Sequence, residues 1–394
     1  VRDPSAPKNS RPMPVRVTNR VGGNTSFIPT YQSFESTMVT VSFVSDDYFV
    51  HLDPTENMNN SDQLDMAIGR IPCRNQVEAQ GVVNKIKLYS QNTGTTSLES
   101  ASACDLTGTE FSMGEWRNWY GFVADDEDFN SYIDAAEQFA DSLKVWYPFL
   151  NVDKVFLDAY LQQSTPGGQR YPEVNEAIRS RVEKGALVLN YIGHGGEVGW
   201  AHERILDLAT VNGWTNNPRL PLFMTATCEF SRFDDPGRVS AGEYVLLNAN
   251  GGGIGLLTTT RLVYSGPNEI LNRNFNKVVL VRDNGVPRTL GDIFMQTKNL
   301  TISQISTSNT RNFTLLGDPA VRLKQPYNKI VADSVNHVAI GSGTDTLKAL
   351  TRITISGHME DQNGNFLSGY NGIVFPTVFD KEQILYSLGN DPGS

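Results

Sequence analysis

A histidine and a cysteine each follow a short apolar run in this sequence. His194 comes after residues 186–192 and has glycines on both sides, and Cys228 comes after residues 220–227 and precedes polar residues. A thiol with an imidazole nearby is the minimum set of groups for nucleophilic acyl transfer. We therefore predict that Cys228 is the nucleophile and that His194 is the general base, and then the general acid for the leaving amine.

Both residues also have a structural explanation. Taken alone, a cysteine such as Cys228 is more often a small buried hydrophobic residue than a nucleophile. A histidine that is buried for structural reasons seldom needs flanking glycines, so His194 is the stronger signal. The other cysteines, Cys73 and Cys104, complete neither a disulfide framework nor a zinc pattern.

The apolar runs predict the strands that position both residues. Continuous apolar runs of this length are typical of parallel strands buried on both faces. In open α/β sheets, ligands bind beyond the carboxyl ends of such strands. Residues 131–146, 173–184 and 240–247 have helical patterns, the last with a capping box from Ser240 and Glu243. We therefore predict an α/β fold with a parallel sheet and helices on both faces.

The composition predicts a globular chain of two or three domains. It has 394 residues and a net charge of −10 with no basic stripe, which argues against a nucleic-acid partner. No apolar run approaches the roughly 18 residues of a membrane span. The coil-like opening lacks an initiator methionine, so we expect a piece of a longer protein. After residues 317–319 short β segments follow, with a hairpin signal at Asn363-Gly364.

Segments around both predicted catalytic residues resemble the gingipain-type cysteine peptidase family. These segments are residues 190–197 and 223–234, with further matches at 67–72, 83–89 and 313–320. Shorter segments at 27–33, 45–49 and 122–126 are similar to the type IX secretion sortases of that family. The resemblance extends from about residue 27 to the C-terminus.

This resemblance implies a domain order and an activity. We expect an incomplete first caspase-like subdomain at residues 1–105, a catalytic caspase-like subdomain at 106–325 and a partial immunoglobulin-like β-sandwich at 326–394. Such an enzyme cleaves the C-terminal sorting domain from type IX cargo through a thioester and transfers the new C-terminus to an anionic lipopolysaccharide. Its partners would be cargo proteins, that lipopolysaccharide and other secretion-system surface proteins, on the extracellular face of the outer membrane of Bacteroidota.

Two alternatives remain open at this point. The chain could be a surface or secreted gingipain-type protease that only hydrolyses, or a catalytically inert surface scaffold. The presence of both His194 and Cys228 argues against the scaffold, because an abandoned site would be free to lose either residue.

The resemblance also implies further residues of the catalytic site. The backbone amides of Gly195 and Cys228 would bind the oxyanion. A carboxylate after the strand at residues 120–124 would orient His194. We favour Asp126 narrowly over Asp125, and a solvated acidic turn or a calcium contact is the alternative explanation of this segment.

Other candidates carry weaker signals. Tyr264, Glu197 and Trp200 are predicted to contact substrate, although an aromatic such as Trp200 could simply cover the sheet edge. His202 is a second imidazole near the site but lacks the glycine setting of His194. No cofactor is expected to be required; structural calcium is possible at Asp46, Asp47 and Asp53, which lack the spacing of an EF-hand.

Overall fold

The computed structural model describes residues 28–33, 42–90 apart from 57 and 59, 114–342 apart from 236, 347–348, 350–370 and isolated positions beyond 370. The chain divides into two compact units. One runs to Lys324 and includes Ser387–Ser394, and the other is Gln325–Tyr386. This division lies one residue from the boundary predicted at 325/326. The boundary predicted at 105, and Cys104 beside it, lie outside the described residues.

A six-stranded sheet forms the centre of the first unit, in the order β13-β10-β9-β5-β1-β2. Five of its strands are parallel, and the edge strand β13 is antiparallel to β10. The bounds are β1 (Trp119–Ala124), β2 (Asn151–Phe156), β5 (Val188–Ile192), β9 (Leu222–Ala226), β10 (Gly255–Thr259) and β13 (Phe313–Gly317). Every residue of β5, β9, β10 and β13 is buried, which explains why these strands are mostly apolar and carry no charged residue.

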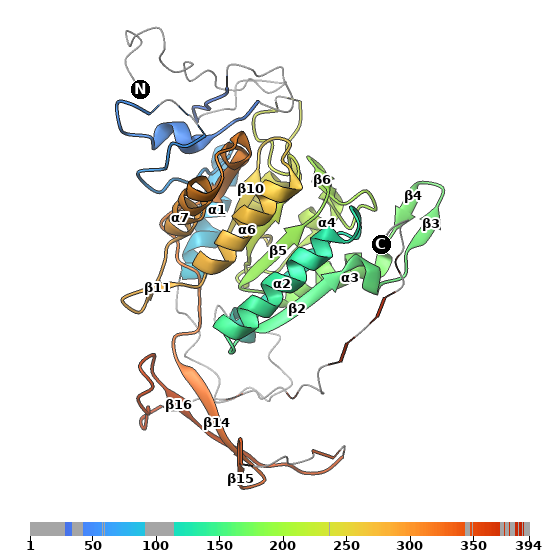
Figure 1. Ribbon diagram of the computed structural model, residues 1–394, viewed down its shortest axis with the longest axis vertical. Coiled ribbons are helices and arrows are strands. Elements are labelled where there is room, and N and C mark those ends of the chain that lie inside the picture. The colour runs from blue at the N-terminus through green and yellow to red at the C-terminus, as the bar shows by residue number, and fades with distance from the viewer. Residues whose placement is uncertain are drawn as a thin grey trace. The chain divides into compact units, whose positions relative to one another are not determined.

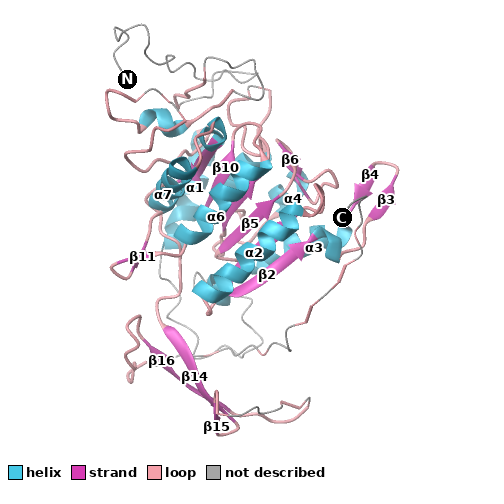
Figure 2. Ribbon diagram, in the orientation of Figure 1, coloured by secondary structure: helices cyan, strands magenta, loops and turns pink. Residues whose placement is uncertain are grey.

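Helices cover both faces of this sheet, as Figures 1 and 2 show. They are α1 (Gln76–Ser90), α2 (Ser131–Trp146), α3 (Pro172–Lys184), α4 (Leu208–Gly213), α5 (Ala241–Leu247), α6 (Ser265–Val278) and α7 (Leu290–Gln304). Apolar residues of α2, α6 and α7 pack in one hydrophobic cluster, and those of α3, α4 and α5 pack in another. The predicted α/β fold with helices on both faces is thus confirmed.

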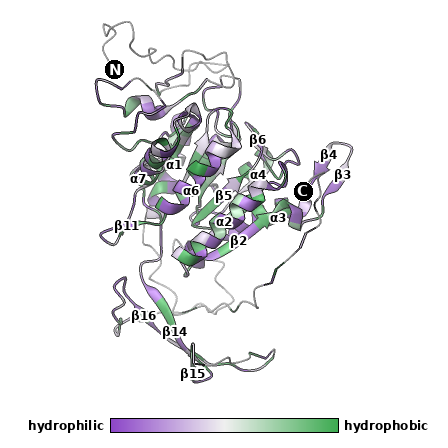
Figure 3. Ribbon diagram, in the orientation of Figure 1, coloured by the Kyte–Doolittle hydropathy of each residue, from purple (hydrophilic) through white to green (hydrophobic). Residues whose placement is uncertain are grey.

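The ends of the helices follow from local sequence. Ser240 and Glu243 form the predicted capping box at the start of α5. Gly185 ends α3 with a φ of 87°, a conformation that favours glycine. Figure 3 shows hydrophobic and hydrophilic stretches alternating along α2 and α6, as expected for helices with one buried face. No helix in the described part of the chain is long and apolar enough to span a membrane.

Short elements connect the main ones. They are the 3₁₀ helices η1 (Asp46–Phe49), η2 (Glu115–Asn118), η3 (Leu157–Ala159) and η4 (Ser308–Asn312), and the strands β3 (Gln163–Thr165), β4 (Gly168–Arg170), β6 (Gly195–Gly196), β7 (Gly199–Trp200), β8 (Leu206–Asp207), β11 (Arg282–Asp283) and β12 (Val286–Pro287). Among these, β6, β7 and β8 form a small sheet directly after His194.

The described part of residues 1–105 belongs to the same compact unit as the catalytic subdomain. The buried Asp47 carboxylate accepts two hydrogen bonds of 2.7 Å from Lys298 of α7 and one of 2.9 Å from Arg311 of η4. Arg70 pairs with Asp46 and forms a parallel bridge with Leu316 of β13. Buried ion pairs thus join these described residues to the predicted catalytic subdomain, and the first subdomain stays a prediction.

The second unit contains an antiparallel sheet of β15 (Val338–Ala339), β14 (Lys329–Val335) and β16 (Ile355–Glu360), in that order. The predicted turn at Asn363-Gly364 is present: the Asp361 amide donates to the Asn365 carbonyl at 3.0 Å, and Gly364 has a φ of 82°. The immunoglobulin-like assignment of this region stays a prediction.

Candidate active site

Strand register brings His194 and Cys228 to the same edge of the central sheet. β5 and β9 are neighbours, and their last residues, Ile192 and Ala226, face each other in register. His194 and Cys228 each follow two residues later, beyond the carboxyl ends of the two strands. Both side chains remain partly accessible, so neither is sealed in the core.

The backbone of the histidine loop is fixed by buried groups. The His194 amide donates to Asp125 Oδ2 at 2.8 Å, and the Tyr191 hydroxyl donates to the His194 carbonyl at 2.5 Å. Asp125 is fully buried, and burial raises the pKa of its carboxyl to about 7. A Cβ atom at Gly193 would lie 2.3 Å from Asp125 Cβ, so only glycine fits beside this carboxyl. Asp125 therefore supports the loop rather than the imidazole.

One nitrogen of the His194 ring faces carboxylates. Its Nε2 lies 3.2 Å from Asp128 Oδ2, 3.5 Å from Glu127 Oε2 and 3.4 Å from the Tyr132 hydroxyl. Tyr132 also meets the imidazole edge-on, with ring centroids 5.5 Å apart. In the described part of the chain, the other ring nitrogen, Nδ1, makes no hydrogen bond. A proton on Nε2 would thus be held by acids, which leaves Nδ1 to accept a proton.

The structure does not bring Asp126, the favoured acid, to the His194 ring. Asp126 is buried, and its Oδ2 accepts a short hydrogen bond from the Tyr171 hydroxyl. Asp125 is engaged with the backbone of residue 194, as described above. The carboxylates at the ring are the next two along the chain, Glu127 and Asp128. Sequence reasoning recognised the acidic run but selected the wrong member of it for this contact.

Cys228 is held beside the loop that precedes α6. Its Sγ lies 3.6 Å from the Val263 carbonyl, to which the thiol donates, and burial raises the pKa of that thiol. The thiol is not hydrogen-bonded to His194 in this structure. Catalytic hydrogen bonds are often long or not yet formed before substrate binds.

Two backbone amides remain available for an oxyanion. The Ala201 amide donates to the His194 carbonyl, so the adjacent Gly195–Trp200 pair is of the non-hydrogen-bonded type and the Gly195 N–H points away from β7. A Cβ at Gly195 would lie 2.6 Å from Thr227 Oγ1, so only glycine fits there. The Cys228 amide has no hydrogen-bond acceptor among the described residues. The predicted oxyanion role of both amides stays a prediction.

The predicted substrate contacts differ in accessibility. Tyr264 is exposed and follows Val263, the residue that accepts the Cys228 hydrogen bond. Glu197 is half-buried and pairs with Arg232 at 2.9 Å and Arg238 at 3.3 Å. Trp200 must be corrected: it is fully buried and stacks on Tyr191 with ring centroids 4.3 Å apart, so it is a core residue and does not face substrate.

The calcium candidates are engaged elsewhere or apart from one another. Asp46 pairs with Arg70, and Asp47 pairs with Lys298 and Arg311, so both carboxylates already neutralise buried cations. Asp53 lies on an exposed turn. Within the described ranges, no group of three or more acidic, histidine or cysteine side chains has a metal-binding arrangement.

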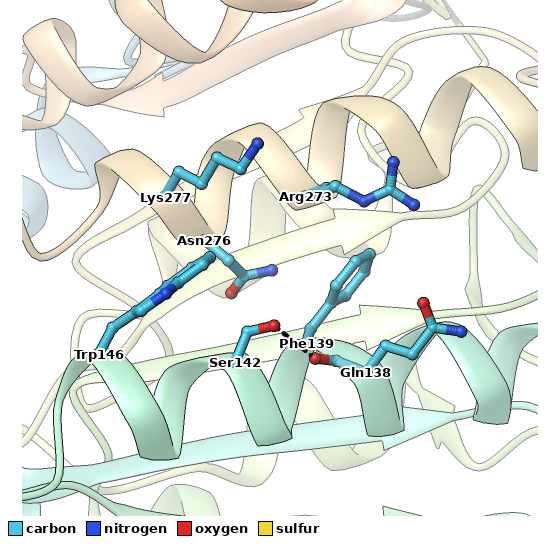
Figure 4. Close-up of a pocket in the computed structure, with 7 residues that line it drawn as sticks. All are labelled: Gln138, Phe139, Ser142, Trp146, Arg273, Asn276 and Lys277. Atoms are coloured by element: carbon cyan, nitrogen blue, oxygen red, sulfur yellow. Dashed lines mark hydrogen bonds between the residues drawn. The ribbon is translucent and has the colours of Figure 1, made fainter.

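A small cavity lies away from these residues, between α2 and α6 (Figure 4). It has a volume of about 130 Å³ and is lined by Gln138, Phe139, Ser142, Trp146, Arg273, Asn276 and Lys277. None of the predicted site residues lines it, so it is not the predicted catalytic site.

Comparisons with known proteins agree with this arrangement of elements. The model of peptidase family C25 matches residues 9–324. The crystal structure of the Arg-specific cysteine proteinase gingipain R has a TM-score of 0.57 and 17% identity, covering 74% of this chain and 62% of that one. The complex of pro- and mature domains of RgpB from Porphyromonas gingivalis has a TM-score of 0.55 and 15% identity, covering 73% and 63%. This chain thus spans less than two thirds of either protein.

A third structure bears on the narrower resemblance. Dimeric latent PorU from Porphyromonas gingivalis is 23% identical and covers 87% of this chain and 25% of that chain, but its TM-score of 0.35 is too low to support an argument. Among curated proteins, none matches this chain. The likeness to gingipain R shows the fold, and the family match extends over most of the sequence. The chain therefore belongs to peptidase family C25, the gingipain-type cysteine peptidases.

Proposed function

We propose that this chain is a cysteine endopeptidase and transpeptidase that acts as a type IX secretion sortase of the PorU kind. The observation that supports it most is the register of β5 and β9, which gives Cys228 and His194 one common edge. The segments at residues 27–33, 45–49 and 122–126 support the narrower assignment. Its substrates would be secreted proteins with C-terminal sorting domains, and its location the outer surface of the outer membrane.

The first chemical step is activation of the thiol. Nδ1 of His194 takes the proton from Cys228 Sγ, while Asp128 and Glu127 hold the Nε2–H and stabilise the imidazolium that forms. The thiolate then attacks the scissile carbonyl carbon. The negative charge that develops on the carbonyl oxygen would be stabilised by the amides of Gly195 and Cys228.

The second step releases the sorting domain. The His194 imidazolium gives its proton to the leaving amine, and the C–N bond breaks to leave a thioester on Cys228. Water would convert this thioester into a carboxylic acid, and an amine would convert it into a new amide. We propose the second outcome, with an amine of the anionic lipopolysaccharide as the acceptor, and hydrolysis as the competing reaction.

Mass analysis of a model cargo tests the proposal. The full chain is incubated with a protein that carries a C-terminal sorting domain, with and without a simple amine such as glycinamide. We expect cleavage that Cys228→Ala abolishes, and an amide product when the amine is present. Only the free acid in both samples would mean a hydrolytic protease. No cleavage, together with no labelling of Cys228 by a thiol probe, would mean an inert scaffold.

A further inference from the structure

A second imidazole lies flat against the His194 ring. His202 and His194 have ring centroids 5.3 Å apart and an angle of 12° between ring planes. The side chain of His202 is 71% exposed, so burial does not force this contact. An exposed ring that nevertheless stacks on the predicted general base must be held there by a specific partner.

That partner is a carboxylate that both histidines share. Glu127 Oε1 lies 2.7 Å from His202 Nδ1, and Glu127 Oε2 lies 3.5 Å from His194 Nε2. Asp128 contacts the same nitrogen of His194 at 3.2 Å. His202 therefore fixes the orientation of one of the two acids that support His194, and it competes with His194 for the charge of that acid.

The charges around His202 favour its cationic form. The hydrogen bond that His202 donates to Glu127, and the negative charges of Glu127, Glu203 and Asp125, raise the pKa of His202 above its ordinary value of 6.5. The protonated form of His202 places a positive charge beside the His194 ring. A neighbouring cation lowers the pKa of an imidazole and of a thiol, because it opposes the imidazolium and favours the thiolate.

We propose that His202 is a positioning residue: through Glu127 and through its own charge, it sets the pH range in which His194 and Cys228 react. The proposal rests on the catalytic roles proposed for His194 and Cys228. Removing the charge of His202 leaves the whole negative charge of Glu127 to act on His194. The pKa values of both reacting groups then rise.

Alkylation of Cys228 by iodoacetamide measures this effect without a substrate. The rate is followed in the full chain between about pH 5 and 9, by mass analysis of the peptide that contains Cys228. His202→Gln keeps a hydrogen-bond donor for Glu127 but removes the charge. His202→Lys keeps both the donor and the charge but removes the ring. His337→Gln, at an exposed histidine of the second unit, is the matched control.

We expect His202→Gln to move the midpoint of the rate profile up by at least about 0.5 pH unit, the effect of one charge about 5 Å away in a water-like medium. His202→Lys should keep the midpoint at or below the native value, and His337→Gln should leave it unchanged. An unchanged midpoint in His202→Gln, or an equal upward shift in both His202 variants, would overturn the proposal. If His194→Ala does not slow the alkylation of Cys228 at all, the catalytic pair itself is wrong.

Discussion

Asp128 contacts the His194 ring and Asp126 contacts the Tyr171 hydroxyl, so replacing one or the other should change the rate of the proposed reaction to different extents. Asp128→Asn should slow cleavage of the model cargo at neutral pH by about tenfold or more, because an amide does not stabilise the imidazolium that protonates the leaving amine. Asp126→Asn should have a much smaller effect on that rate. A larger loss in Asp126→Asn than in Asp128→Asn would contradict the assignment.

The raised pKa of the buried Asp125 should make the stability of the fold depend on pH. Its pKa is raised from 3.8 to about 7, chiefly by burial, so the folded state binds this proton more tightly than the unfolded state. Stability is therefore lost as pH rises from about 4 to about 7, by up to about 4 kcal/mol at about 1.4 kcal/mol per pKa unit. Urea unfolding of the native chain and of Asp125→Asn at about pH 5 and 8 tests this. The Asn variant should gain relative stability at the higher pH, and a pH-independent difference would refute the prediction.

The common sheet edge of His194 and Cys228 could be predicted from sequence, but the acids that contact the His194 ring could not. His194 and Cys228 follow apolar runs that identify them directly. Which acid contacts the imidazole depends on the local backbone. Asp128, Phe129 and Asn130 are three successive residues with φ values of 56°, 58° and 60°. Such left-handed conformations are uncommon outside glycine, and nothing in these residue types indicates that they occur in succession. They turn the chain so that Asp128 reaches the ring.

At the scale of elements, burial on both faces made the strands predictable. The runs that contain β5 and β9 are apolar at nearly every position because helices cover both sides of the sheet. The short apolar segment at residues 66–68 forms no strand, and only Arg70 bridges to Leu316 there. At this edge of the sheet, the chain forms one isolated bridge to β13 instead of a paired strand. A short apolar pattern in the sequence does not distinguish an isolated bridge from a strand.

A buried lysine of α1 donates to backbone carbonyls at the end of α5 and in the loop that follows it, so its replacement should lower stability. Lys85 of α1 donates to the carbonyls of Leu246 at 2.9 Å and Gly251 at 2.7 Å, and burial lowers its pKa to about 7. Lys85→Met should destabilise the fold by about 1–3 kcal/mol, because it leaves these carbonyls without their donor. Lys87→Met, at an exposed position of the same helix, is the control and should change stability little. Equal unfolding midpoints for Lys85→Met and the native chain would count against this role.

At the scale of the whole molecule, the change to short β segments after residue 319 lies close to the division between the units at Lys324 and Gln325. The relation of residues 42–70 to the catalytic subdomain was not predictable, because it depends on Asp47 meeting Lys298 and Arg311 more than 250 positions later. Contacts this distant in sequence leave no local pattern. Because their distant partners are not visible in the sequence, Asp46 and Asp47 resemble weak calcium ligands there.

The buried cluster of Asp47, Lys298 and Arg311 should contribute strongly to the stability of the first unit. Asp47→Asn leaves two buried cations without their carboxylate and should cost about 3–5 kcal/mol. Asp53→Asn, on an exposed turn, should cost little. Urea unfolding followed by circular dichroism compares the two. A loss below about 1 kcal/mol in Asp47→Asn would show that the cluster does not hold these segments together.

The central claim is that His194 activates the thiol of Cys228. The most direct measurement is the rate of iodoacetamide alkylation of Cys228 at neutral pH in the native chain and in His194→Ala, with the thiol of Cys73 as internal reference. The account predicts at least about a tenfold slower reaction of Cys228 in His194→Ala and an unchanged rate at Cys73. Equal rates of Cys228 alkylation in the two proteins would contradict it.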